Sequence, residues 1–556
     1  MTAAALRSLI LALLAVPVAM PALAEPSQQQ EEQQHLEELR NTVVNLLQAL
    51  VDRGVLTREQ AEQMVKAAQE KASADAVAAA QQRQQREKED ANAVRVPYVP
   101  QIVKDEIRKE VADQLAPQVT QQVVSQAKSE GWGVPAALPE WLEHITWSGD
   151  VRVRGEADVY ANNNAQFAYY NYNVINAAGG IAKAGDQAYL DTTQNRYYPL
   201  VRLRLNVNAD LGGGWQSGAR ISTGTLVNPD SLNQVEGQYG GRYTTDVDLA
   251  YLGWSNTPLL PRNAVTIWAG KYANPFFYSD LLWMPDVTFE GVAADYRLRL
   301  AGSPQAPLSW YLTAAAVPEQ DVPLTDDFGS SSNNKWLYAG ETGLDWHFNE
   351  GSRLRFGIAY YYFDHIAGVL NAFQSDTTNY TAPPYVQKGN TMFDIANSGN
   401  PATDNLFALA ADFHELDAIL GADWVLSPRL RLSFFGDFVR NLGYKEAAVA
   451  ARVGSPVAPR VDGYESMLTL GSPSLDHAGA WETFVGYRYI ERDAVVDAFT
   501  DQDYHLGGTD AKGYILGARV NLTPHVYARL RYMPFQAIDG PPLTIDVWQL
   551  ELLGSF

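Results

Sequence analysis

From Trp147 to the last residue, hydrophobic and polar positions alternate in many separate runs. In "SGDVRVRGEADVY", Val151, Val153, Gly155, Ala157 and Val159 share one face, and arginine and acidic side chains share the other. A period of two is typical of a β-strand whose faces meet different surroundings. Many runs reach about the 9–11 residues that a tilted strand needs to cross a bilayer. The pattern predicts transmembrane strands with one face toward lipid and one toward water.

Fifteen such runs can be recognised directly, but a barrel with both ends in the periplasm needs an even number. Short periplasmic turns and long external loops must alternate, and assigning them from the N-terminal end and from the C-terminal end leaves one strand missing between 490 and 511. The apolar "AVVDAF" at 494–499 is taken as that strand. The pattern therefore predicts a mainly β fold, a 16-stranded antiparallel transmembrane β-barrel at 147–556. The expected strands are 148–160, 200–210, 215–224, 246–256, 264–272, 286–298, 308–317, 336–348, 353–363, 414–425, 429–440, 480–490, 494–499, 511–522, 525–534 and 545–556.

Long external connections follow from the same alternation. They are expected at 161–199, 225–245, 273–285, 318–335, 364–413, 441–479, 501–510 and 535–544. The last strand, "TIDVWQLELLGSF", is expected to close on the first, because an open edge cannot exist in lipid. Trp548, Leu550 and Leu552 would then face lipid, and Phe556 would lie in the aromatic belt at the inner rim.

The N-terminal part has a different pattern. Residues 1–24 combine a positive charge, a short apolar run and an Ala-Leu-Ala site, which predicts a signal peptide. Residues 25–132 have helical spacing, with a short coiled-coil seam that begins at Leu36. The seam indicates either a periplasmic oligomerisation stalk or an amphipathic helix that folds back on its own chain. Residues 133–146 are expected to be a linker.

Composition excludes several classes of function. The formal charge of −22 argues against a nucleic-acid partner, and the absence of cysteine excludes disulfides and thiol chemistry. No motif of a hydrolase, a zinc protease or a nucleotide-binding loop is present, so neither an enzyme nor a cofactor is expected. "DQDYHLGGTD" at 501–510 has the residue types of a calcium loop without the EF-hand spacing, so a polar external loop is the favoured interpretation.

Several stretches resemble the bacterial putative porins that carry a periplasmic helical extension. The matching residues include "VRVPYVP", "ITWSGDVRVRGE", "DLAYLGW", "AGKYANPFFYSDLLWMPDVTFEGVAADY" and "YRYIERDAVVDAFTDQDYHLGGTDAKGYILG". The resemblance covers most of 94–300 and 480–556. It implies an outer-membrane β-barrel for passive diffusion, and the terminal Phe556 resembles the signal read by the barrel-assembly machinery.

The strand pattern places charged side chains on the water-facing side, where they would line a pore. The candidates are Arg152, Arg154, Glu156, Asp158, Arg202, Arg204, Arg220, Asp248, Asp280, Glu290, Asp345, Asp423, Arg431, Arg519, Arg529 and Arg531, with Arg297 and Asp417 in addition. Either they form a charged constriction that selects ions, or they only solvate the wall and neutralise one another.

The third external segment, "NPFFYSDLLWMP", is unusually apolar for a loop in water. One hypothesis is that it enters the lumen with Asp280 facing the arginines. The other is that its aromatic residues pack against a neighbouring barrel or the aromatic girdle.

The sequence thus predicts a porin in the outer membrane of a Gram-negative cell, with its N-terminal region in the periplasm. Its partners would be outer-membrane lipid, small hydrophilic solutes or ions, and the barrel-assembly machinery. A homotrimer is suggested by the coiled-coil seam and the apolar third segment. The alternative function is an envelope-tethering or surface-interaction protein that uses the barrel as an anchor.

Overall fold

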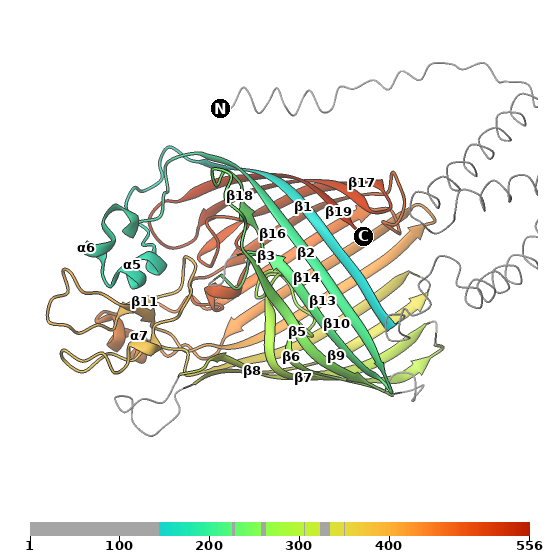
Figure 1. The fold of residues 1–556 in the computed structure, drawn as a ribbon, viewed down its shortest axis with the longest axis horizontal. Helices are drawn as coiled ribbons and strands as arrows, with labels where there is room; N and C mark the ends of the chain where they lie inside the picture. The colour runs from blue at the N-terminus through green and yellow to red at the C-terminus, as the bar shows by residue number, and fades with distance from the viewer. Residues whose placement is uncertain (1–143, 225–227, 257–262, 305, 323–333, 350) are drawn as a thin grey trace, which may run out of the picture. The chain divides into compact units, whose positions relative to one another are not determined.

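The computed structural model describes residues 144–556, apart from 225–227, 257–262, 305, 323–333 and 350. Sixteen antiparallel strands of the described chain form a closed barrel (Figure 1). They are β1 (Ile145–Tyr160), β2 (Arg196–Gly212), β3 (Trp215–Thr223), β5 (Thr245–Ser255), β6 (Asn263–Ala273), β7 (Thr288–Gly302), β8 (Pro307–Gln320), β9 (Lys335–Asn349), β10 (Ser352–Asp364), β13 (His414–Ser427), β14 (Leu430–Asn441), β15 (Asp462–Gly471), β16 (Trp481–Ile490), β17 (Ala511–Thr523), β18 (Val526–Ala537) and β19 (Thr544–Ser555).

The first and last strands close the barrel. β1 pairs with β2 on one side and with β19 on the other, with Arg154 opposite Glu551 in the second pairing. The predicted closure is therefore confirmed. All long strands have two partners, so this sheet leaves no long edge open to lipid.

The two faces of the strands differ as the alternation predicts. On β1, Val151 and Val153 are 41% and 47% exposed, whereas Arg152 and Arg154 are 6% and 1% exposed. On β19, Trp548, Leu550 and Leu552 lie on the exposed face. Since a closed sheet has only an outer and an inner face, the apolar side chains point outward and the arginines point inward.

The predicted number of strands is right, but one predicted strand is wrong. Residues 494–499 do not pair with the sheet; they lie in the connection between β16 and β17, which contains the short helix η4 (Asp497–Phe499). They are apolar because Ala494, Val495 and Val496 are buried inside the barrel. The missing strand is β15, within the segment expected to be a single long loop at 441–479.

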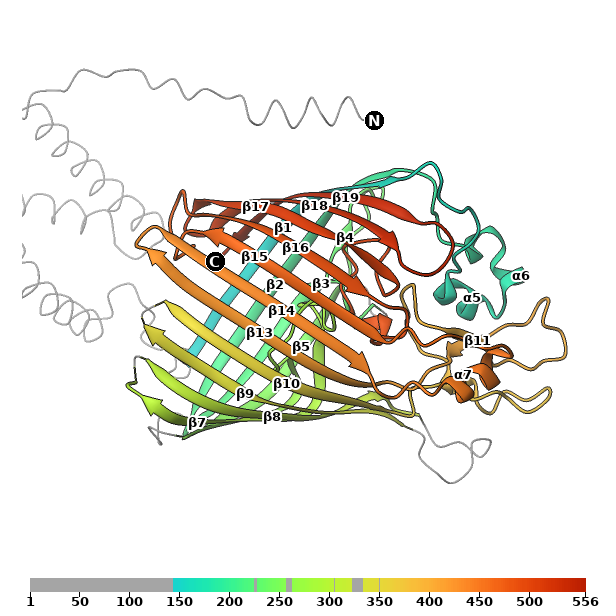
Figure 2. The ribbon, with the colours of Figure 1, turned by 180° about the vertical axis from the view of Figure 1, so that it is seen from behind.

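The long connections gather at one end of the barrel, and the C-terminus and short turns lie at the other (Figures 1 and 2). The short elements of the long connections are α5 (Tyr172–Ala178), α6 (Ile181–Ala184), η2 (Gly185–Ala188), β4 (Gln234–Val235), η3 (Asn379–Thr381), β11 (Met392–Asp394), β12 (Phe407–Leu409), α7 (Glu446–Val453) and η4. At the opposite end, β2 ends and the turn to β3 follows with three consecutive glycines, Gly212 to Gly214, whose positive φ favours glycine.

No helix among the described residues is long and apolar enough to cross a membrane. The predicted signal peptide at 1–24, the helical region at 25–132 and most of the linker at 133–146 lie outside the described residues. The envelope-tethering alternative depends on that helical region, so it stays a prediction.

Deleting Phe556 should reduce the amount of folded barrel in the outer membrane. Its backbone N–H and C=O exchange two hydrogen bonds of 3.0 Å with Gly149, and these bonds fix the end of the closing seam. The measurement is the folded fraction of the full-length protein, from the change in gel migration on heating. Phe556→Tyr should behave as wild type because it keeps the backbone bonds and the aromatic ring. Wild-type yield after the deletion would contradict a role of Phe556 in assembly.

Candidate functional site

The connection at 274–287 folds into the barrel. Leu281, Leu282 and Trp283 are almost completely buried within this chain. The ring of Trp283 lies 4.8 Å from that of Phe289, 5.4 Å from that of Tyr361 on β10 and 5.3 Å from that of Phe499. The hypothesis that this segment enters the barrel is therefore confirmed. The alternative hypothesis, that these side chains pack against a neighbouring barrel, is wrong, because they are buried inside this one.

Polar contacts hold the 274–287 connection to the wall. The Phe277 backbone N–H donates to Glu341 Oε2 of β9 at 2.8 Å, and the Ser279 hydroxyl donates to Asp437 of β14. Two further hydrogen bonds join it to the connection at 491–510: Met284 N–H to Phe499 O, and the backbone N–H of Asp501 to the carbonyl oxygen of Asp280. These two connections therefore form one unit inside the barrel.

Arginines of β2 meet an acid of the 274–287 connection. Arg202 lies 2.9 Å from Asp150 and 3.1 Å from Asp286, and Arg204 lies 2.7 Å and 3.5 Å from the same two carboxylates. Asp286 was missed by sequence reasoning, although it directly follows the apolar segment that was singled out. The predicted Asp280 instead lies 4.0 Å from Arg488 of β16.

A second acid, Asp503 of the 491–510 connection, holds two further arginines. It lies 2.7 Å from Arg154 on β1 and 2.5 Å from Arg531 on β18. Burial would raise the pKa of Asp503, but the charges of Arg154 and Arg531 outweigh it and hold this pKa well below its usual range. Asp503 is ionised at neutral pH and locks the connection to the wall.

The neighbouring Asp501 has a different environment. It lies 3.2 Å from Arg488, which also pairs with Glu465 of β15 at 2.5 Å. Burial and the nearby Asp503 charge raise the pKa of Asp501 to about 6. Two of the three carboxylates of the calcium-loop hypothesis, those of Asp501 and Asp503, thus contact guanidinium groups. Among the described residues, no group of three or more His, Asp or Glu side chains could hold a metal ion.

The other candidates form smaller groups, most of them on the inner face, whereas the side chain of Glu290 is 53% exposed. Glu156 contacts Tyr198 and Gln549, Arg152 donates to Asn233, and Asp158 and Asp417 are buried. The remaining pairs are Arg220–Asp248, Glu290–Lys271, Asp345–Arg353, Asp345–Arg297, Arg431–Glu482, Arg519–Glu482 and Arg529–Glu551, and Asp423 accepts a hydrogen bond from Ser433.

The accessibility of the guanidinium groups changes along the barrel. Three that contact the two inward-folded connections, on Arg154, Arg202 and Arg488, are 1–6% exposed, and Arg531, which contacts Asp503, is 11% exposed. Toward the end with short turns, the side chains of Arg204, Arg431, Arg519 and Arg529 are 23–27% exposed. The accessible positive charge therefore lies in the half of the barrel that these connections leave open.

Comparison with known proteins agrees with this architecture. A family model described as "Putative porin" matches residues 40–556. Among solved structures, OprB of Pseudomonas putida is 12% identical with a TM-score of 0.40, and the match covers 75% of this chain and 96% of that one. OmpF of Salmonella typhi in complex with daunomycin is 12% identical with a TM-score of 0.37, covering 74% and 97%.

The anion-selective porin of Comamonas acidovorans is 11% identical with a TM-score of 0.37, covering 74% of this chain and 99% of that one. These TM-scores are too low to carry an argument. A search of curated proteins finds no match. Because the family model covers the whole barrel, the chain belongs to the putative porin family and is an outer-membrane β-barrel channel rather than an enzyme.

Proposed function

We propose that the chain forms a water-filled channel for passive diffusion of small hydrophilic solutes or ions, and that its arginine-rich wall favours anions. The observation that carries the proposal is the inward folding of two connections, whose Asp286 and Asp503 face arginines of β1, β2 and β18. A barrel of sixteen strands is wide enough for an aqueous lumen. Two folded segments narrow that lumen, and charges beside a narrow water path set its ion preference.

Ion pairing with acidic residues determines which arginines can contribute to the proposed anion preference. Asp286 and Asp503 compensate much of the charge of Arg154 and Arg202, so these residues serve mainly to hold the two connections. Arg152 has only the amide oxygen of Asn233 as its hydrogen-bond acceptor among the described residues. Arg204 is partly accessible. The proposal therefore assigns the anion preference to Arg152, to Arg204 and to the accessible arginines near the short turns.

Replacing Arg152 and Arg204 by Gln should lower the anion-over-cation permeability ratio. The double variant removes two positive charges, while Arg202 still pairs with both Asp150 and Asp286. The measurement is the reversal potential of purified full-length channels in planar bilayers under a salt gradient. Lys183→Gln is the matched control, because Lys183 is exposed on α6 and its loss should leave the reversal potential unchanged. An unchanged reversal potential in the double variant would contradict the assignment of the anion preference to Arg152 and Arg204.

The proposed assembly is a homotrimer inserted by the barrel-assembly machinery. One of the two features that suggested a trimer no longer does so, because the apolar third external segment packs inside its own barrel rather than against a neighbour. The coiled-coil seam is the remaining support, and it lies outside the described residues.

A further inference from the structure

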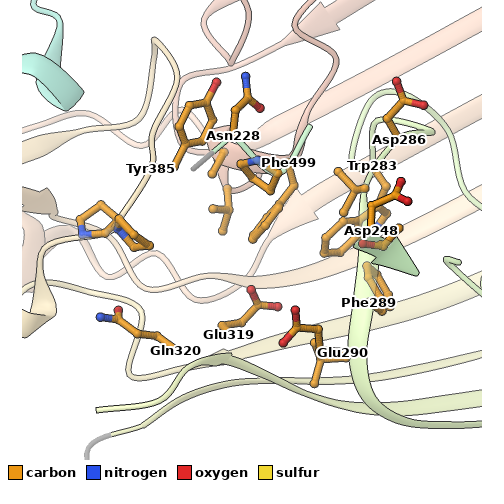
Figure 3. A pocket seen from close by; sticks show the side chains of 18 of the residues that line it. Asn228, Asp248, Trp283, Asp286, Phe289, Glu290, Glu319, Gln320, Tyr385 and Phe499 are labelled. Atoms are coloured by element: carbon orange, nitrogen blue, oxygen red, sulfur yellow. The ribbon is translucent and has the colours of Figure 1, made fainter. Parts of the chain in front are cut away.

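A cavity of ≈ 520 Å³ lies at the end of the barrel with the long connections (Figure 3). Its walls come from the ends of β3 and of β5 to β9, from residues 228–232, and from the connections at 274–287, 365–413 and 491–510. Small-molecule sites are typically concave spaces of about 300–1,000 Å³. The cavity is therefore large enough for a small organic molecule.

One part of the cavity wall is aromatic. Trp283, Phe289, Tyr385 and Phe499 line it, and they come from four separate segments. The ring of Trp283 contacts those of Phe289 and Phe499, as described above, so the three rings form a fixed surface. Such a surface can bind an apolar group, and the faces of aromatic rings also attract cations.

The rest of the wall is rich in carboxylates. Six acids line the cavity among the described residues, against two lysines: Asp246, Asp248, Asp286, Glu290, Glu319 and Asp497, with Lys271 and Lys335. An excess of negative charge around a concave apolar space favours cations over neutral or anionic molecules.

Four of the six carboxylates have hydrogen-bond or ion-pair partners, but Asp246 of β5 and Glu319 of β8 have none among the described residues. Asp248 pairs with Arg220, Asp286 with Arg202 and Glu290 with Lys271. The Lys335 ammonium donates to the carbonyl oxygen of Thr381 at 3.1 Å. Glu319 makes no hydrogen bond or ion pair with any residue that the structure describes. Lys271 and Lys335 act on Glu319 through their charges but form no hydrogen bond or ion pair with it. This partly buried carboxylate can therefore still accept a cation from solution.

We propose that this cavity binds an organic cation with an apolar body. Its ammonium group lies at Glu319, and its apolar part lies against Phe499 and the other rings. Figure 3 shows Glu319 and Glu290 next to each other, with Phe499 across the cavity from them. The inference goes beyond the proposed function, because binding here is measured without ion flow. A failure to bind and an unchanged reversal potential are separate results.

Isothermal titration calorimetry of the full-length protein in detergent tests the proposal. The probes are 2-phenylethylammonium, the neutral 2-phenylethanol and the anionic 3-phenylpropanoate. We expect the cation to bind about 10-fold more tightly than the alcohol, and the anion to bind most weakly. This series uses the wild-type protein, so it does not depend on whether a variant folds. Equal affinities for the cation and the alcohol, or tighter binding of the anion, would overturn the proposal.

The Glu319→Gln variant locates the site. Affinity for 2-phenylethylammonium should fall about 5- to 10-fold, while affinity for 2-phenylethanol should stay the same. Glu446→Gln is the control, because Glu446 is an exposed carboxylate on α7 outside the cavity. If Glu319→Gln is folded by its gel migration and binds the cation as wild type does, the assignment to this cavity is wrong.

Discussion

Trp283→Ala is expected to release the 274–287 connection from the wall and to raise the unitary conductance. The side chain is 1% exposed and packs against Phe289, Tyr361 and Phe499. Truncating a buried tryptophan costs about 3–5 kcal/mol through lost contacts and the cavity left behind. Single-channel recording gives the conductance, and thermal unfolding in detergent gives the stability.

Trp346→Ala is the matched control, because Trp346 lies on the exposed face of β9 and is 47% accessible. Its conductance should equal that of wild type. If Trp283→Ala lowers the melting temperature without changing the conductance, the 274–287 connection does not narrow the ion path. That result would separate its role in stability from its proposed role in permeation.

Asp503→Asn should have the second large effect, on the connection at 491–510. The change keeps the size of the side chain and removes the negative charge between Arg154 and Arg531. Removing one partner of a buried ion pair typically destabilises by about 3–5 kcal/mol, since the other charge stays buried without compensation. Amide hydrogen exchange of residues 491–510 should become faster, which mass spectrometry can measure.

The dependence of folding stability on acid pH is a further test of the ion pairs that Asp503 forms. The pKa of Asp503 is lowered from 3.8, so the pair contributes stability above pH 3.8 and loses it as pH falls below that value. The pH dependence that Asp501 gives to the folding stability is the reverse. Because its pKa is raised to about 6, the protonated carboxyl stabilises the folded state, and this contribution is lost as pH rises through about 6. Wild type should therefore keep the Asp503 contribution at pH 5, and Asp503→Asn should lack it at every pH.

Asp404→Asn is the control for this experiment. Asp404 pairs with Lys183 at 2.8 Å, but the two side chains are 38% and 52% exposed. An exposed pair contributes about 0–1 kcal/mol, so its loss should hardly change hydrogen exchange at 491–510. Equal effects of the two substitutions would mean that the Asp503 pair does not hold the connection.

The inward-folded connections divide the arginines into two groups. The buried group, with Arg154, Arg202 and Arg488, holds the connections through carboxylates. The accessible group, toward the short turns, is available to the proposed ion path. The buried group fits the interpretation in which the charges neutralise one another, and the accessible group is the one to which we assign the proposed ion selectivity.

The strand pattern was a good guide because it records local surroundings. Lipid on one face and polar groups on the other impose a period of two on every long strand, so the number of strands, their faces and the closing strand could be predicted. β15 was missed because Ser466 lies on its exposed face and Met467 on its inner face, which breaks the alternation. Residues 494–499 were misassigned because burial inside the barrel makes a segment apolar without making it a strand.

The partners of the charges could not be predicted in this way. Arg154 and Asp503 are 349 positions apart, and no local pattern marks either as the partner of the other. Only closure of the barrel and the inward folding of two connections bring them together. The strand alternation and the family resemblance were enough to predict the barrel and the side of each strand that carries charge. The pairs of charges, the inward folding of the two connections and the position of the cavity depend on contacts between distant segments, so they appear only in the folded chain.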